Sequence, residues 1–146
     1  MADINWKYLA YRAIRLILLS YGTVAIYAYG FSDRSIFPAV STTYETLPDL
    51  KQIPTSNGQT IALRHLKNAS AKYTLVMSHG NGEDLGDMQG EMERFRAMGL
   101  NVVAYDYRGY GKSQGSASVA NVYDDIDSMY RHLTESLKVA PDRILL

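Results

Sequence analysis

Residues 76–87, VMSHGNGEDLGD, hold the feature on which the interpretation of the whole chain depends. An apolar run ends at His79, two glycines follow with an asparagine between them, and acidic residues suited to a helix start come next. Gly-rich turns between a strand and a helix occur in dinucleotide-binding proteins, P-loop nucleotidases and serine hydrolases. The rest of the sequence has to distinguish among these three classes.

The segments around this stretch predict several strands. Asn57-Gly58 is a hairpin signal between LKQIP and TIALRHL, which indicates two antiparallel strands. YTLVMS at 73–78 and NVVAYD at 101–106 are short apolar runs, typical of strands buried on both faces of a sheet. The segment DRILL at 142–146 begins a third run of this kind.

Two amphipathic segments alternate with these runs. One begins at Asp84 and has Gly99 in the position that follows a helix; the other begins at about Ser118 and is stopped by Pro141. Their apolar positions, at spacings of three and four, are Leu85, Met88, Met92 and Phe95, then Val119, Val122, Ile126, Met129, Leu133 and Leu137. The fold class is therefore α/β, with an antiparallel hairpin leading into a parallel βαβαβ sheet.

Composition excludes several function classes. The 146 residues, 47% of them apolar, suit one ordinary domain with a buried core. With 15 basic and 15 acidic residues there is no electrostatic case for a nucleic-acid partner. The chain has no cysteine, which excludes disulfides, thiol catalysis and thiolate-bound zinc. We expect no cofactor and no metal, since Glu83, Asp84 and Asp87 suit the first turn of a helix without a cation.

The N-terminus differs in kind from the rest. Residues 16–31 carry no charge, whereas Lys7, Arg12 and Arg15 precede them. Residues 13–31 are long enough for a single membrane span, with Arg15 reaching back to the interface. The basic flank predicts a cytoplasmic N-terminus, with the domain on the far side of the membrane.

Two alternatives to a membrane anchor remain open. Ala28-Tyr29-Gly30 offers a small-x-small cleavage site, so the segment also fits a signal peptide and a secreted or periplasmic product. It also fits a helix that lies in the membrane interface or packs on its own domain. We divide the chain into an anchor or signal segment (1–31), a linker without helical period that includes the first strand (32–56), and the α/β domain (57–146).

The first two classes of Gly-rich turn fit poorly. A dinucleotide fingerprint needs a third glycine where this chain has Leu85, and Glu83 and Asp84 would repel a pyrophosphate. Because Asp106 ends the next strand, this class stays a distant alternative. A P-loop at Gly111-Lys112-Ser113 would need a glycine in place of Asp106.

The third class, the serine hydrolases, fits the motifs at the ends of two predicted strands. His-Gly-Asn at 79–81 ends one predicted strand, and DYRGYGKS at 106–113 ends the next. Together they resemble the α/β-hydrolase superfamily, in particular its membrane-anchored, single-span serine hydrolase branch, which is similar to acylglycerol lipases and protein depalmitoylases. The resemblance covers residues 30–146 and implies a substrate that is a small molecule or an acylated group.

The resemblance also implies roles for individual residues. The backbone N–H of Asn81, or alternatively that of Gly82, would belong to an oxyanion hole. His79 would support the loop through hydrogen bonds, and Gly80 would allow a sharp turn beside the substrate. Asp106 and Arg108 would organise the second loop, as an ion pair. Ser113 would be the loop serine of the family and not the nucleophile, and His65 and His132 would be ordinary strand and helix residues.

The nucleophile of a serine hydrolase stands on a turn that should follow the strand beginning DRILL. On this basis the chain is expected to be the N-terminal part of a hydrolase acting on an acyl ester, thioester or amide, with nucleophile, acid and base outside residues 1–146. The 146 residues by themselves are expected to be inactive. The alternative is a non-catalytic membrane-tethered module or a decayed remnant.

Overall fold

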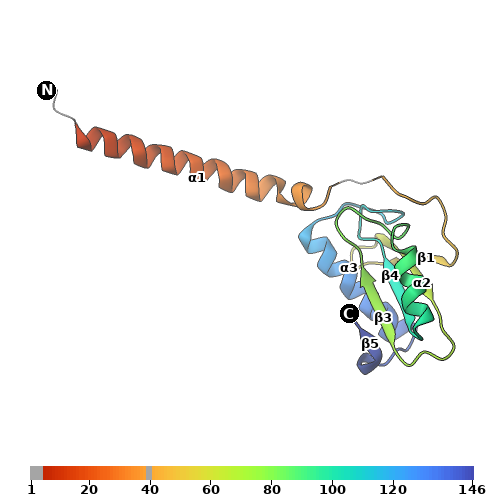
Figure 1. Cartoon of the computed structure of the whole chain (residues 1–146). Helices are drawn as coiled ribbons and strands as arrows, with labels where there is room; N and C mark the ends of the chain where they lie inside the picture. The colour runs from red at the N-terminus through yellow and green to blue at the C-terminus, as the bar shows by residue number, and fades with distance from the viewer. Residues whose placement is uncertain (1–4, 39–40) are drawn as a thin grey trace.

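The computed structural model describes residues 5–38 and 41–146. A mixed sheet lies at the centre of the C-terminal part, and the long helix α1 projects away from it (Figure 1). The helices are α1 (Trp6–Ile36), α2 (Gln89–Ala97) and α3 (Val119–Arg131), with a π-helical turn (His132–Ser136) after α3 and a 3₁₀ turn (Pro141–Arg143) later. The strands are β1 (Leu50–Pro54), β2 (Thr60–Leu66), β3 (Thr74–Ser78), β4 (Asn101–Tyr105) and β5 (Ile144–Leu145).

The sheet has the order β1-β2-β4-β3-β5. β1 and β2 are antiparallel and join through a turn in which Gly58 has a φ of 82°. β2 is also antiparallel to β4, whereas β3 is parallel to both β4 and β5. The predicted α/β class, with a hairpin leading into a parallel βαβαβ sheet, is therefore confirmed.

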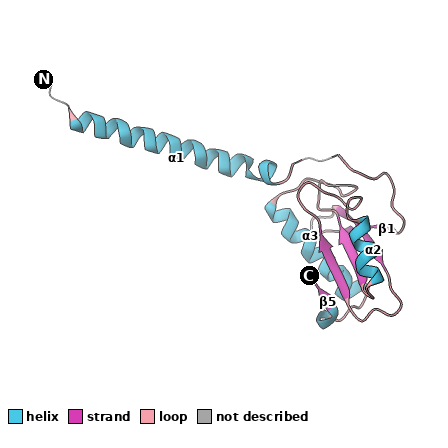
Figure 2. Cartoon of the chain, in the orientation of Figure 1, coloured by secondary structure: helices cyan, strands magenta, loops and turns pink. Residues whose placement is uncertain are grey.

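The two helices after the hairpin cover opposite faces of the sheet (Figure 2). Val102 and Ala104 of β4 pack in a cluster with Met92 of α2, while Val103 and Tyr105 pack with Met129 of α3. Because successive side chains of a strand point to opposite faces, these two clusters define three layers. The predicted apolar faces accordingly supply Leu85, Met88 and Met92 to one core and Met129 and Leu133 to the other.

Several predicted boundaries are wrong. The first helix begins at Gln89 and not at Asp84. The second leaves α-helical geometry after Arg131 and continues only as a π-helical turn. Within DRILL only Ile144 and Leu145 form the last strand, since the 3₁₀ turn before it runs to Arg143. Gly99, by contrast, lies just after α2 with a φ of 94°, as expected for the residue that ends a helix.

Helix α1 is longer than the predicted span at both ends. Asn5 caps its start by accepting the Tyr8 N–H at 3.1 Å, and the helix continues to Ile36, so the expected absence of helix in 32–36 is wrong. None of its residues is buried against the rest of the chain. Among the described residues it is the one helix whose length and composition would allow it to cross a membrane.

Candidate functional site

The ends of β3 and β4 bring the two sequence motifs together. The strands are parallel and Ser78 lies opposite Tyr105, so His79 and Asp106 follow at the same edge of the sheet. Ligand sites in open α/β sheets form at this carboxyl edge, because the loops leave the strands there. The candidate site therefore consists of the loop after β3 and the loop after β4.

His79 is buried and supports both loops. Its Nδ1 lies 2.7 Å from the Gly80 carbonyl oxygen, and its Nε2 lies 3.4 Å from the Tyr107 backbone nitrogen. These contacts fit the tautomer with the proton on Nδ1, because Nδ1 then donates to Gly80 while Nε2 accepts from Tyr107. The ring also packs against Tyr107 and Tyr110, at centroid distances of 4.3 and 5.2 Å. In this position the imidazole fixes the loop.

The next two residues leave their backbone donors open. The Asn81 carbonyl accepts from the Tyr110 hydroxyl at 2.8 Å, and the Asn81 side-chain amide donates to the Ile36 carbonyl at 2.8 Å. Within residues 5–38 and 41–146, neither the Asn81 nor the Gly82 backbone N–H donates a hydrogen bond. Both residues are exposed. The carbonyl and the side chain of Asn81 are thus held in place, while the backbone N–H groups of Asn81 and Gly82 remain open to solvent.

Gly80 does not have the role that the sequence suggested for its backbone. Its φ lies outside the left-handed range, so no special conformation requires a glycine. An added Cβ would lie 3.0 Å from the Glu83 Oε2, the end of a flexible side chain. The turn is instead closed by two hydrogen bonds, since the Gly80 N–H donates to Glu83 Oε2 at 2.9 Å and the Glu83 N–H donates to the Gly80 carbonyl at 3.1 Å.

Asp106 ties three segments together. Its fully buried carboxylate accepts from the Tyr44 hydroxyl and from the Leu85 N–H, the latter at 2.8 Å. His79 Nε2 lies 3.8 Å from the same carboxylate. Burial raises the pKa of Asp106, while the hydrogen bonds from Tyr44 and Leu85 act in the opposite direction. Asp106 thus links the segment before β1 to both strand-end loops.

The expected ion pair between Asp106 and Arg108 does not form. Arg108, also fully buried, pairs through Nε with Asp125 at 2.6 Å and through Nη2 with Asp124 at 2.7 Å. Its backbone N–H donates to Asp125 as well, at 2.9 Å. Two neighbouring carboxylates of α3 match the forked guanidinium, whereas the Asp106 carboxylate is already occupied by Tyr44 and Leu85. Arg108 therefore fastens the second loop to α3.

The acidic residues after Gly82 form a turn and not a helix start. Buried Asp84 accepts from the Thr43 and Gly86 N–H groups at 2.7 and 2.8 Å, and Asp87 accepts from the Asp84 N–H at 3.1 Å. Side-chain bonds of this type compete with helical ones, which explains the later start of α2. The macrodipole explanation for Asp84 and Asp87 is therefore wrong. In the part of the chain that the structure describes, no group of three or more His, Cys, Asp or Glu is arranged to hold a metal.

Ser113 lies in residues 111–115, GKSQG, which match the nucleophile pattern G-x-S-x-G letter by letter. Its hydroxyl donates to the Asp106 carbonyl at 2.7 Å and accepts from the Ala62 N–H at 2.8 Å. The pattern also lies in a loop and not on a sharp turn from strand into helix. Gly111 is required for another reason, since its φ is 49° and an added Cβ would lie 1.9 Å from Asp106 Oδ2. Ser113 thus braces the loop.

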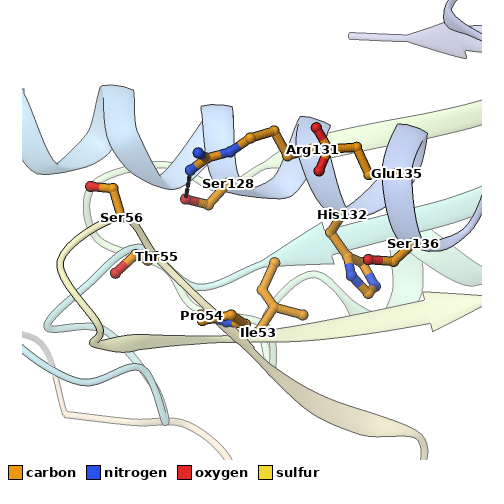
Figure 3. Close-up of a pocket in the computed structure, with 9 residues that line it drawn as sticks. All are labelled: Ile53, Pro54, Thr55, Ser56, Ser128, Arg131, His132, Glu135 and Ser136. Atoms are coloured by element: carbon orange, nitrogen blue, oxygen red, sulfur yellow. Dashed lines mark hydrogen bonds between the residues drawn. The ribbon is translucent and has the colours of Figure 1, made fainter.

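A polar cavity lies away from the two strand-end loops. Its volume is about 280 Å³, and it lies between the end of β1 and the helical segment that follows Ser128 (Figure 3). Arg131 donates to the Ser128 hydroxyl at 3.1 Å there. Burial, helped by Lys51, lowers the pKa of His132, which also lines this cavity. None of the predicted site residues contributes to its wall.

Several residues of the strand-end site were missed by the sequence analysis. Tyr107 and Tyr110 were visible as a repeated aromatic in the second loop, but nothing local marked them as partners of His79. Tyr44 comes from a segment that carries no motif, and Asp125 looked like an ordinary polar position of a helix. Their contacts are long-range, and only the fold reveals them.

The sheet order, the two covering helices and the paired strand-end loops are those of the α/β-hydrolase fold. A family model described as serine aminopeptidase, S33, matches residues 69–146, just over half of the chain. The chain belongs to this hydrolase family.

Curated relatives agree with this class. The chain is 38% identical over 94 residues to alpha/beta hydrolase domain-containing protein 17B of Xenopus laevis, which covers 63% of the chain and 33% of that protein. It is 41% identical over 81 residues to alpha/beta hydrolase domain-containing protein 17C of Homo sapiens, covering 53% of the chain and 24% of that protein. The chain thus spans about a third or less of the length of these relatives.

Solved structures support the fold. Esterase Pf2001 of Pyrococcus furiosus superposes with a TM-score of 0.57 at 20% identity, over 70% of this chain and 42% of the esterase. The esterase EaEST of Exiguobacterium antarcticum gives a TM-score of 0.52 at 23% identity, over 66% of this chain and 34% of the esterase. At these identities the likeness concerns the fold alone.

Proposed function

We propose that these residues form the N-terminal part of a membrane-anchored serine hydrolase that cleaves an acyl ester, thioester or amide. In this proposal the loop after β3 supplies a backbone donor of the oxyanion hole, from Asn81 or alternatively Gly82. The nucleophile, acid and base come from outside residues 1–146. The substrate is a small molecule or an acylated group.

The observation that carries the proposal is the pair of open N–H groups at the end of β3. When a nucleophile attacks a carbonyl, negative charge develops on the carbonyl oxygen, and a donor that is already in place stabilises it. Asn81 is held through its carbonyl and its side chain, by Tyr110 and Ile36, so its N–H keeps a fixed direction. A fixed donor of this kind is worth about 3 kcal/mol in the transition state.

Helix α1 is proposed as the membrane anchor. None of its residues is buried in this structure, and residues 16–31 carry no charge. Lys7, Arg12 and Arg15 lie before the run, which favours a cytoplasmic N-terminus and a domain on the far side. A cleaved signal segment would give a secreted or periplasmic domain, and mass spectrometry of the N-terminus of the mature protein distinguishes the two.

An activity-based probe tests the hydrolase proposal. A fluorophosphonate reacts covalently with an activated serine, and antibodies against residues 41–146 would isolate the native protein from its source cells after labelling. We expect the isolated polypeptide to be labelled, and the 146 residues expressed alone to remain unlabelled. An unlabelled native protein would contradict the proposal and favour the non-catalytic module.

Ser113→Ala provides the matched control within the chain. Because the Ser113 hydroxyl is occupied by Asp106 and Ala62, we expect its removal to leave labelling of the full-length protein in place. Loss of labelling in a Ser113→Ala protein that still folds would instead make GKSQG the nucleophile motif and would overturn the assignment of the triad to other residues.

A further inference from the structure

The last turn of α1 touches the loop that carries the open N–H groups. The Asn81 side chain donates to the Ile36 carbonyl at 2.8 Å, although the two residues are 45 positions apart. The final carbonyls of a helix have no partner within the helix. Asn81 therefore satisfies one end group of α1, and in doing so it fixes the end of the helix at the rim of the candidate site.

The same turn of α1 also touches α3. The Val119 N–H, the first of α3, donates to Asp33 Oδ1 at 3.2 Å across 86 positions. The first N–H groups of a helix lack internal partners and carry the positive end of its dipole, so a carboxylate is favourable there. The C-terminal end of α1 and the N-terminal end of α3 thus each gain a hydrogen-bond partner at the same place.

A cavity of about 400 Å³ lies at this junction. One wall comes from the end of α1 and the residues that follow it, and the other from the loop between β4 and α3. Tyr110, which lines the cavity, is also the residue that holds the Asn81 carbonyl. We define this junction, formed by Asp33, Ile36, Asn81, Tyr110 and Ser116, as the rim.

We infer that the rim is a phospholipid-contacting surface, so that the candidate site opens into the headgroup layer of the bilayer. The inference rests on the proposed membrane anchor. The predicted span ends at Phe31, and Ile36 lies five residues further along the helix, about 7.5 Å at 1.5 Å per residue. The headgroup layer on one side of a bilayer is about 5–8 Å thick. A rim tied to Asp33 and Ile36 is therefore held within or against that layer.

Residues 1–146 contain no cysteine, so in this chain each engineered thiol is the only one. Three full-chain variants in phosphatidylcholine vesicles would carry a nitrobenzoxadiazole label: Ser116→Cys at the rim, Ala69→Cys in the turn before β3, and Val24→Cys within α1. All three positions are exposed, and Ala69 lies at the opposite end of β3 from Asn81. Nitroxide-bearing lipids quench a label at the depth of the nitroxide.

We expect a headgroup nitroxide to quench the Ser116 label several-fold more than the Ala69 label, and an acyl-chain nitroxide to quench the Val24 label. Equal quenching of the Ser116 and Ala69 labels, with the Val24 label quenched, would overturn the rim inference and leave the anchor standing. An unquenched Val24 label would overturn the anchor and the inference with it. Asp33→Ala in the Ser116→Cys chain should reduce the headgroup quenching if the tie to α3 holds the rim in place, and unchanged quenching would contradict that tie.

Discussion

The two strand-end loops use their backbone donors in opposite ways. In the loop after β4, the N–H groups of Arg108, Gly109, Tyr110, Lys112 and Ser113 all donate to partners within the described chain. In the loop after β3, those of Asn81 and Gly82 have no partner there. Asn81 and Gly82 are exposed, so solvent can satisfy these two donors until a ligand replaces it, and the loop after β3 therefore suits a binding position. The loop after β4, with these donors paired, is typical of a structural support.

The supporting loop acts directly on the open one. The Tyr107 hydroxyl donates to the His79 carbonyl at 3.1 Å, and the Tyr110 hydroxyl donates to the Asn81 carbonyl at 2.8 Å. Arg108 in turn fixes the supporting loop to α3. Damage to the support should therefore cost stability, whereas damage to the open donors should cost activity alone.

The largest expected effect on stability belongs to Arg108. Arg108→Met leaves the carboxylates of Asp124 and Asp125 without their cation, and breaking a buried ion pair costs about 3–5 kcal/mol in the free energy of unfolding. Arg96→Met is the matched control, because its pair with Glu93 is exposed and worth at most about 1 kcal/mol. Urea unfolding followed by circular dichroism measures both. Equal losses in the two variants would show that the supporting loop does not depend on its buried arginine.

A smaller effect is expected at Tyr44. Tyr44→Phe removes the hydroxyl that donates to buried Asp106, and a buried acceptor left without a donor costs about 1–3 kcal/mol. Tyr73→Phe, at an exposed position, should leave the free energy of unfolding nearly unchanged. Thermal unfolding of the two variants side by side checks this. A Tyr44→Phe protein as stable as Tyr73→Phe would mean that the tie between the segment before β1 and the loop after β4 carries little energy.

The smallest effect is a pH dependence from the loop after β3. Burial raises the pKa of Asp84, but the hydrogen bonds from Thr43 and Gly86 lower it more, so that its pKa lies below the usual 3.8. Its ionised form therefore stabilises the fold above pH 3.8, and this contribution is lost as the pH falls through the lowered pKa. Asp84→Asn should lose less free energy of unfolding between pH 6 and pH 3 than the parent chain. A parallel decline in both proteins would exclude Asp84 as a source.

The sequence predicted the fold class because its signals are local. Apolar periodicity, the Asn57-Gly58 turn and two strand-end motifs each lie within a few residues, and together they identified the strands that pair in the sheet. The start of α2 was misplaced because side chains of Asp84 and Asp87 bond to the backbone nearby. That competition depends on Thr43, which is 41 residues away.

The site was predicted less completely, for the same physical reason. The expected ion pair joined Asp106 to Arg108, but α3 supplies the carboxylates for Arg108, from 16 and 17 positions away. Tyr44 reaches Asp106 across 62 positions, a contact that no pattern in one sequence reports. The motif GKSQG shows that a pattern can also match without its chemistry, since its letters fit a nucleophile pattern while the Ser113 hydroxyl bonds to Asp106 and Ala62 within the loop.

The central claim is that a backbone N–H at Asn81 stabilises the transition state, and kcat of the full-length hydrolase tests it most directly. Proline at position 81 removes that N–H, and the preceding Gly80 has no Cβ to clash with the ring. We predict that Asn81→Pro lowers kcat on the order of a hundredfold, whereas Asn81→Ala, which keeps the N–H, changes it only a few-fold. An Asn81→Pro enzyme with the kcat of the parent would contradict the assignment.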